Sequence, residues 1–151
     1  SIKDEYDFIV EKSADYLNWR YCDPRGGDYK VYIAEEAQEI KGYLVLRVNR
    51  ADPLHHVGYI MEVLALKDSL EVIDSLIMEA MRVFMEEGVE TVYFSVIDGH
   101  PYEKILKSYG FIDSRREPYL SYRDYKLVDI TSFVGAAPDR IHYQFGEFDS
   151  I

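Results

Sequence analysis

Apolar residues recur with two different periods along residues 57–97, and this stretch organises the rest of the chain. Val57 to Leu66 (VGYIMEVLAL) is an almost continuous apolar run of strand length. From Leu70 to Phe84 the apolar positions follow helical spacing, and this helix is predicted to end at Gly88. Val89 to Ile97 (VETVYFSVI) is rich in β-branched and aromatic residues and predicts a second strand. Two strands joined by so long a helix form a βαβ unit, so we expect a parallel βαβ core at 57–97 with a right-handed crossover.

The pattern predicts further elements on both sides of this core. We expect helices at 4–20 and 100–109, a hairpin of strands at 29–36 and 40–50 with its turn at 37–39, one or two strands at 115–131, and a last strand at 141–145. The fold class is therefore α/β or α+β, with one mixed central β-sheet flanked by helices. No linker or internal repeat divides the chain, so residues 1–151 are expected to form a single domain.

The order strand, helix, strand, short helix, closed by Tyr109-Gly110-Phe111, resembles the GNAT (GCN5-related N-acetyltransferase) superfamily over residues 29–125. A second resemblance lies at Tyr16 to Tyr21 (YLNWRY), which is similar to a stretch in microbial proteins with two GNAT-like halves. The chain resembles the degenerate C-terminal half of such a tandem protein, which implies that it is an excised half. The resemblance also implies an upstream GNAT half of the same protein, or a homodimer, as the partner.

Charge and cysteine content narrow the possible partners. The formal net charge of −11 disfavours nucleic acid and anionic membranes, because both require a basic surface. Cys22 is the only cysteine, so no internal disulfide can form, and we expect a reducing, cytoplasmic environment. His55 and His56 are adjacent and point to opposite sides of an extended chain, so we expect no metal site there.

The resemblance implies acetyl-CoA as the cofactor, but the positions that would hold its pyrophosphate depart from the family pattern. A loop of Gln/Arg-x-x-Gly-x-Gly/Ala should follow the strand end at Leu64 and Leu66. Its key positions are here Glu71, Asp74 and Leu76. Two like charges about 4 Å apart near a surface repel by about 1–4 kcal/mol, whereas a helix N-terminus attracts an anion by about 0.3–1 kcal/mol. These carboxylates suit an unliganded helix start better than a phosphate site.

The short helix departs from the family pattern as well. The family has an asparagine, a small residue and a tyrosine, whose places are taken by Gly99, Tyr102 and Leu106. In the family the two core strands splay apart and the pantetheine arm lies between them. We therefore expect this gap to be narrowed or filled, with Tyr102, Leu106 or Tyr93 among the residues that close it. The acetyl-CoA site is expected to be lost and no cofactor to bind.

Glu62 is the one candidate catalytic residue, because a glutamate on this strand acts as a base in parts of the family. Strand alternation predicts that it shares a face with Ile60 and Leu64, which would raise its pKa by desolvation. Two structural alternatives stay open. The strand could twist the carboxylate to the rim of the sheet, or the carboxylate could pair with Arg47 or Lys41 on the neighbouring strand.

Three functions remain open at this stage. The first is a GNAT-like domain that has lost its own acetyl-CoA site and supports a catalytic N-terminal half or acceptor binding. The second is an active N-acetyltransferase that moves an acetyl group from acetyl-CoA to an amine with Glu62 as base. The third is a stand-alone peptide- or sugar-binding module. If an upstream half is missing, we expect an exposed apolar patch or strand edge.

Overall fold

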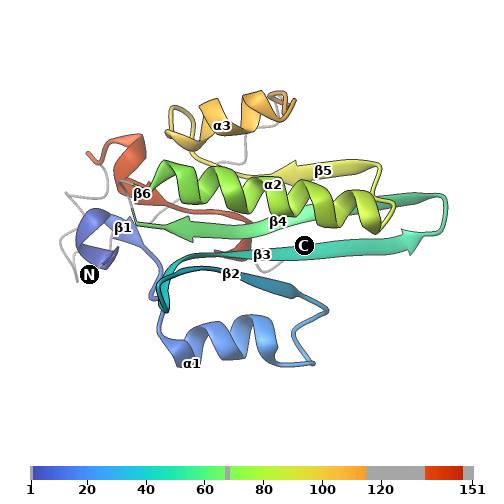
Figure 1. The fold of residues 1–151 in the computed structure, drawn as a ribbon, viewed down its shortest axis with the longest axis horizontal. Helices are drawn as coiled ribbons and strands as arrows, with labels where there is room; N and C mark the ends of the chain where they lie inside the picture. The colour runs from blue at the N-terminus through green and yellow to red at the C-terminus, as the bar shows by residue number, and fades with distance from the viewer. Residues whose placement is uncertain (1, 67–68, 115–134, 148–151) are drawn as a thin grey trace, which may run out of the picture.

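The fold is taken from a computed structural model, which describes residues 2–66, 69–114 and 135–147. A four-stranded sheet forms its centre, with the strand order β2-β3-β4-β5 (Figure 1). These strands are β2 (Lys30–Glu36), β3 (Glu39–Asp52), β4 (His55–Ala65) and β5 (Thr91–Phe94). β4 and β5 are parallel, as the sequence predicts, and the other neighbours are antiparallel. The strands predicted at 115–131 lie outside the described residues.

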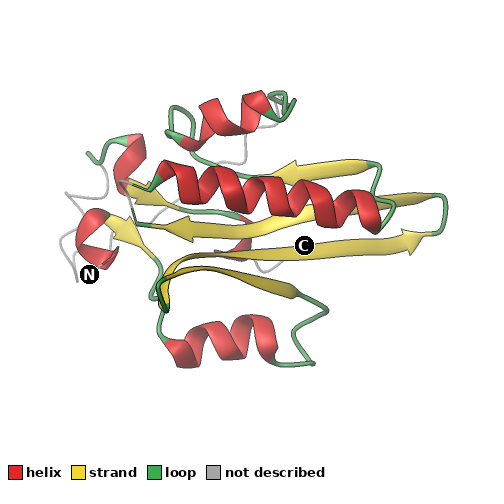
Figure 2. Cartoon of the chain, viewed as in Figure 1, coloured by secondary structure: helices red, strands yellow, loops and turns green. Residues whose placement is uncertain are grey.

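One face of the sheet is covered by α2 (Leu70–Glu86), and α3 (Tyr102–Ser108) lies beside α2 (Figure 2). The apolar stripe of α2 packs on the sheet, with Ile73, Leu76, Ile77, Ala80, Val83 and Phe84 all buried. Leu44, Leu46, Ile60 and Val63 complete this core from the strands, and Leu106 joins it from α3. The residues that α2 buries against the sheet therefore follow the helical spacing that the sequence predicts.

The β2–β3 hairpin turns at Ala37 and Gln38, where the sequence places it. Both residues have positive φ angles, 51° and 65°. Such left-handed conformations match the twist of a two-residue hairpin, although side chains other than glycine and asparagine adopt them at a cost. The turn position was thus predictable from polarity, but the backbone strain within it was not.

The helix predicted at 4–20 is wrong. A 3-10 turn η1 (Ile2–Glu5) is followed by β1 (Phe8–Ile9), and the helix α1 spans only Ala14–Leu17 before a π-helical turn, η2 (Asn18–Cys22). β1 pairs in parallel with β6 (Ile141–His142), which is also shorter than the predicted strand at 141–145. This pairing with the C-terminal segment overrides the local helical pattern. Two 3-10 turns flank β6, namely η3 (Pro138–Arg140) and η4 (Phe145–Glu147).

A bulge in β4 changes which face its residues occupy. Consecutive residues Val45 and Leu46 of β3 pair with Glu62 and Ile60, so Met61 is an extra residue in β4. Ile60 consequently joins the core under α2, whereas Met61 packs on the opposite face with Val45 and Tyr21. The prediction that Glu62 shares a face with Ile60 is wrong for this reason. No helix within the described ranges is long and apolar enough to span a membrane.

Candidate functional site

β4 and β5 separate beyond Ile60. Their register runs only from Val57 paired with Thr91 to Ile60 paired with Phe94, so the rest of β4 extends past β5. On this part of β4 both backbone groups of Val63 are bonded to the side chain of Gln144. The Val63 N–H donates to Gln144 Oε1 at 2.8 Å, and Gln144 Nε2 donates to the Val63 carbonyl at 3.2 Å. Gln144 therefore hydrogen-bonds to β4 as a further strand would.

Two more side chains line the same part of β4. His142 places Nε2 at 3.4 Å from the Val63 carbonyl, and the Tyr102 phenol is hydrogen-bonded to Tyr6 and to the backbone of Ala65. Burial is the main reason why the pKa of Tyr102 lies above its ordinary value, so this phenol stays protonated. Tyr102 thus lies beside the β4 edge, in the place where the sequence predicts a closing residue.

Leu106, the second residue predicted to close the gap, is buried in the same core cluster as Tyr102. Tyr93, the third, is 39% exposed and stacks on Tyr59 with ring centroids 5.8 Å apart, so it lies elsewhere. The contact between Gln144 and β4 was not predicted. Nothing in the local sequence of residues 141–145 (IHYQF) indicates that this amide bonds to a strand 81 residues earlier.

Glu62 is fully buried and both of its oxygens have partners. The Tyr21 hydroxyl donates to Oε2 at 2.5 Å, and the Tyr43 hydroxyl donates to Oε1 at 2.6 Å. The Lys12 ammonium lies 2.7 Å from Oε1. The carboxylate is therefore neither at the rim of the sheet nor paired with Arg47 or Lys41, as the sequence-based alternatives proposed.

These partners reverse the expected shift in the pKa of Glu62. Burial alone would raise that pKa, but the Lys12 ammonium and the hydrogen bonds favour the charged form, so the pKa is lowered. The prediction that apolar neighbours on the strand raise the pKa of Glu62 is therefore wrong. A carboxylate whose proton affinity is reduced is a poorer general base, and its oxygens already accept bonds from Tyr21, Tyr43 and Lys12.

Lys12 links Glu62 to the C-terminal segment. Its ammonium also contacts Glu147 Oε1 at 2.5 Å, and the backbone N–H of Gln144 donates to Glu147 Oε2 at 2.6 Å. Glu62, Glu147 and His142 place potential ligand atoms within 4.8 Å of one another. The Lys12 ammonium, however, bridges the two carboxylates, so a positive charge already occupies the place between them.

Glycine at position 146 allows the C-terminal segment to approach η2. A Cβ at Gly146 would lie 2.0 Å from the Tyr21 hydroxyl oxygen, which is far inside van der Waals contact. Arg20 Nε donates to the Gly146 carbonyl at 2.9 Å and fixes the same approach. The segment 141–147 is thus held against β4 by bonds from both N-terminal and central elements.

The first turns of α2 carry the positions compared with the phosphate loop. Glu71 and Asp74 are exposed, whereas Leu76 is buried in the core. On β4, Leu64 is buried at 2% exposure, and Leu66 beyond it is 44% exposed. Two carboxylates therefore face solvent on the first turns of α2, where the family brings the cofactor's phosphates.

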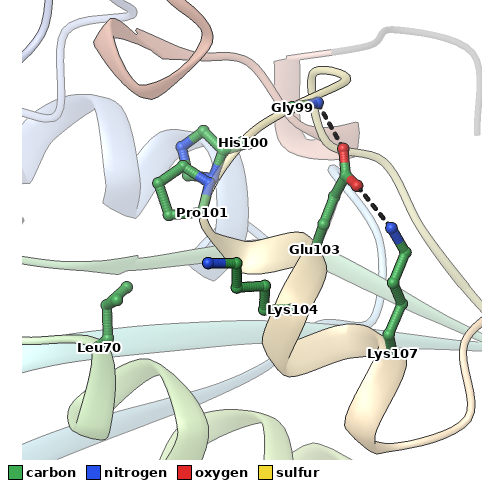
Figure 3. Close-up of a pocket in the computed structure, with 7 residues that line it drawn as sticks. All are labelled: Leu70, Gly99, His100, Pro101, Glu103, Lys104 and Lys107. Carbon is green, nitrogen blue, oxygen red and sulfur yellow. Dashed lines mark hydrogen bonds and ion pairs between the residues drawn. The ribbon is translucent and has the colours of Figure 1, made fainter.

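A cavity of about 420 Å³ lies between the start of α2 and α3 (Figure 3). Within it Glu103 accepts a bond from the Gly99 N–H at 2.5 Å and another from Lys107 Nζ at 2.9 Å. Gly99 has a φ of 79°, which favours glycine. The cavity is lined by Leu70, Gly99, His100, Pro101, Glu103, Lys104 and Lys107.

No protein-family model matches the chain, and no curated protein matches it by sequence. Solved structures do match its fold. A Vibrio cholerae integron cassette protein is 16% identical with a TM-score of 0.61, over 89% of this chain and 87% of that one. The aminoglycoside acetyltransferase meta-AAC0020 from an uncultured soil metagenomic sample, solved with sisomicin, is 15% identical with a TM-score of 0.57 over 76% of each chain.

The aminoglycoside N-acetyltransferase AAC(6′)-Iy, solved with CoA, is 15% identical with a TM-score of 0.50, over 62% of this chain and 75% of that one. Identities this low establish the architecture and not the activity. The mixed sheet, the parallel β4–β5 pair joined by α2 and these structural neighbours together give the chain the GNAT acetyltransferase fold.

Proposed function

We propose that this chain is a GNAT-fold domain that does not bind acetyl-CoA in its own cleft, and that it supports a catalytic GNAT half or its acceptor site. The observation that carries the proposal is the pair of hydrogen bonds between the Gln144 amide and the backbone of Val63. In the family, this edge of the strand is the part that holds the pantetheine arm.

A cofactor could reach this edge only by displacing Gln144. Each hydrogen bond lost contributes about 0.5–1.5 kcal/mol net, and a buried amide left without partners costs about 1–3 kcal/mol more. Gln144 is only 2% exposed, so its displaced amide could form hydrogen bonds with water only if the segment 141–147 moved. That segment is also held by Lys12 and Arg20 through Glu147 and Gly146, so moving it would break these bonds as well.

Charge at the start of α2 supports the same conclusion. Exposed Glu71 and Asp74 would face the pyrophosphate, and Lys107 in the nearby cavity is already paired with Glu103. Neither position on α2 offers the small or basic residue that a phosphate loop requires. Like-charge repulsion therefore adds to the steric closure by Gln144.

The rival function, an active acetyltransferase with Glu62 as base, is less well supported. The lowered pKa of Glu62 and its three partners hold this carboxylate charged and enclosed. The supporting role rests instead on the resemblance to the second half of tandem GNAT proteins. In the tandem protein that this proposal implies, deleting the domain should reduce acetyl transfer, whereas Glu71→Gln should leave it unchanged.

Calorimetric titration of the isolated chain with acetyl-CoA tests the proposal. We expect no saturable binding heat at micromolar concentrations of acetyl-CoA. Tyr102→Ala should give the same result, because Glu71 and Asp74 still repel the phosphates and Gln144 still occupies the edge of β4. Gln144→Ala should also fail to bind, since the carboxylates still repel the phosphates. Micromolar affinity in the unmodified chain would overturn the proposal and make Glu62 the leading catalytic candidate.

A further inference from the structure

Three potential ligand side chains from two distant segments converge on one buried point. Glu62 lies on β4, whereas His142 and Glu147 belong to the C-terminal segment 141–147. Each side chain offers one ligand atom, and the three atoms lie within 4.8 Å of one another. Glu62 is fully buried, and the side chains of His142 and Glu147 are at most 2% exposed. The cluster is therefore closed to bulk water, and its members must find their partners within it.

The imidazole of His142 directs a lone pair into this cluster. Its Nε2 lies 3.4 Å from the Val63 carbonyl, which can only accept a hydrogen bond, so in the neutral ring the proton is on Nε2 and Nδ1 is an acceptor. Nδ1 is buried, lies 3.9 Å from Glu147 Oε1 and has no hydrogen-bond partner among the described residues. Metal-ligating histidines show this arrangement, with one ring N–H bonded to a carbonyl and the other nitrogen facing the ion.

The Lys12 ammonium satisfies the two carboxylates but not the imidazole. It lies 2.7 Å from Glu62 Oε1 and 2.5 Å from Glu147 Oε1, whereas His142 Nδ1 receives no bond from it. Two carboxylates and one lone pair thus face a single positive charge. A buried acceptor without a donor is unfavourable. A divalent cation would supply the second positive charge and accept all three ligand atoms.

We propose that Glu62, His142 and Glu147 bind a zinc ion, which takes the place of the Lys12 ammonium between the two carboxylates. Zinc binds imidazole nitrogen and carboxylate oxygen together, whereas magnesium and calcium take oxygen ligands. Zinc also commonly combines three protein ligands with one water molecule. Tetrahedral ligands at about 2.0–2.2 Å from zinc lie about 3.4 Å apart, so the widest pair needs to close from at most 4.8 Å to that separation.

Lys12 can leave the cluster without unfolding a helix or strand. Residues 10–13 lie between β1 and α1 in neither kind of element. The lysine stem is flexible, and the ammonium lies 5.5 Å from the centroid of the Tyr16 ring, which is only partly buried. The ammonium therefore has a short path along this ring to solvent. Zinc binding makes no use of acetyl-CoA and does not require the function proposed above.

Calorimetric titration of the chelator-treated chain with ZnCl₂ tests the site. We expect one zinc ion per chain and no saturable binding of MgCl₂ at the same concentrations. His142→Gln should weaken zinc binding by at least about tenfold, because it removes the nitrogen ligand. His55→Gln is the matched control: His55 is 70% exposed and pairs with Glu90, so this variant should leave the affinity unchanged. Circular dichroism of each variant establishes that it is folded.

Exchange with Lys12 gives a second test, which a zinc site elsewhere on the surface would not pass. Lys12→Met removes the competing ammonium, so zinc should bind this variant at least about tenfold more tightly than the unmodified chain. Zinc should also raise the urea midpoint of Lys12→Met more than that of the unmodified chain, because a tighter ligand stabilises the folded state more. An unmodified chain that binds no zinc, binding that His142→Gln leaves intact, or a Lys12→Met variant that zinc fails to stabilise would overturn the proposal.

Discussion

A single lysine joins the three parts of the chain that meet at the centre of the molecule. Lys12 comes from the N-terminal segment, Glu62 from β4 and Glu147 from the C-terminal segment. All three side chains are at most 7% exposed. Buried charges are tolerated only when they are paired and hydrogen-bonded. At the scale of the residue, these ion pairs explain why 141–147 stays against β4.

Replacing Lys12 by methionine should therefore destabilise the protein strongly. The variant leaves two buried carboxylates without their cation, and breaking a buried pair in this way costs about 3–5 kcal/mol. Lys41→Met is the control, because Lys41 pairs with a Glu39 side chain that is 73% exposed, and such a surface pair contributes about 0–1 kcal/mol. Urea unfolding of both variants measures the difference. Equal losses for the two would contradict the structural role of Lys12.

His142 should make stability depend on pH. Burial lowers its pKa below the ordinary 6.5, although Glu62 and Glu147 oppose the shift. The unfolded chain then binds the proton at a pH where the folded chain does not, so the free energy of unfolding falls as the pH drops below about 6.5. Glu62, whose pKa is also lowered, adds a further loss at more acidic pH.

The measurement is urea unfolding at several pH values for the unmodified chain and for His142→Gln. The variant lacks the titrating ring but retains a polar side chain, so its stability should change less between about pH 7 and pH 5.5. An identical slope for both proteins would show that His142 does not titrate with unfolding.

At the scale of the element, the parallel βαβ unit was the part of the fold best predicted from the sequence. The helical spacing of the apolar residues and the glycine at position 88 are both signals in the local sequence. They are confirmed by α2, which ends at Glu86 and buries its apolar face against the sheet. The segment at 4–20 was mispredicted because β1 is formed by pairing with β6, about 130 residues away, which local periodicity cannot reveal. The bulge at Met61 had no sequence signal either, and it changes the face of Glu62.

The β2–β3 turn offers a prediction at this same scale. Ala37 and Gln38 both have positive φ, where asparagine and glycine are favoured. Changing the pair to Asn-Gly should raise the free energy of unfolding by about 0.5–1 kcal/mol, because it removes backbone strain. Thermal or urea unfolding measures the change. A loss of stability would contradict the backbone conformation described here.

At the scale of the whole molecule, the GNAT sheet is present while the gap beside its central strand is lined by the chain's own residues. The position of Tyr102 near the end of this strand could be predicted from the order of elements, and its phenol is hydrogen-bonded to the backbone of Ala65. Gln144 and Lys12 could not be predicted, because both act through contacts between distant segments. The proposed closure of this edge of β4 therefore depends most on the two hydrogen bonds between Gln144 and Val63.

The Val63 amide resonance in NMR spectra of the isolated chain tests this contact most directly. Gln144→Ala should shift the resonance, because the N–H loses its bond at 2.8 Å to Gln144 Oε1. Adding acetyl-CoA to the unmodified chain should leave the resonance in place, because Gln144 retains the edge of β4. A saturable shift of the Val63 amide on addition of acetyl-CoA would contradict the account, since the cofactor would then have taken the place of Gln144.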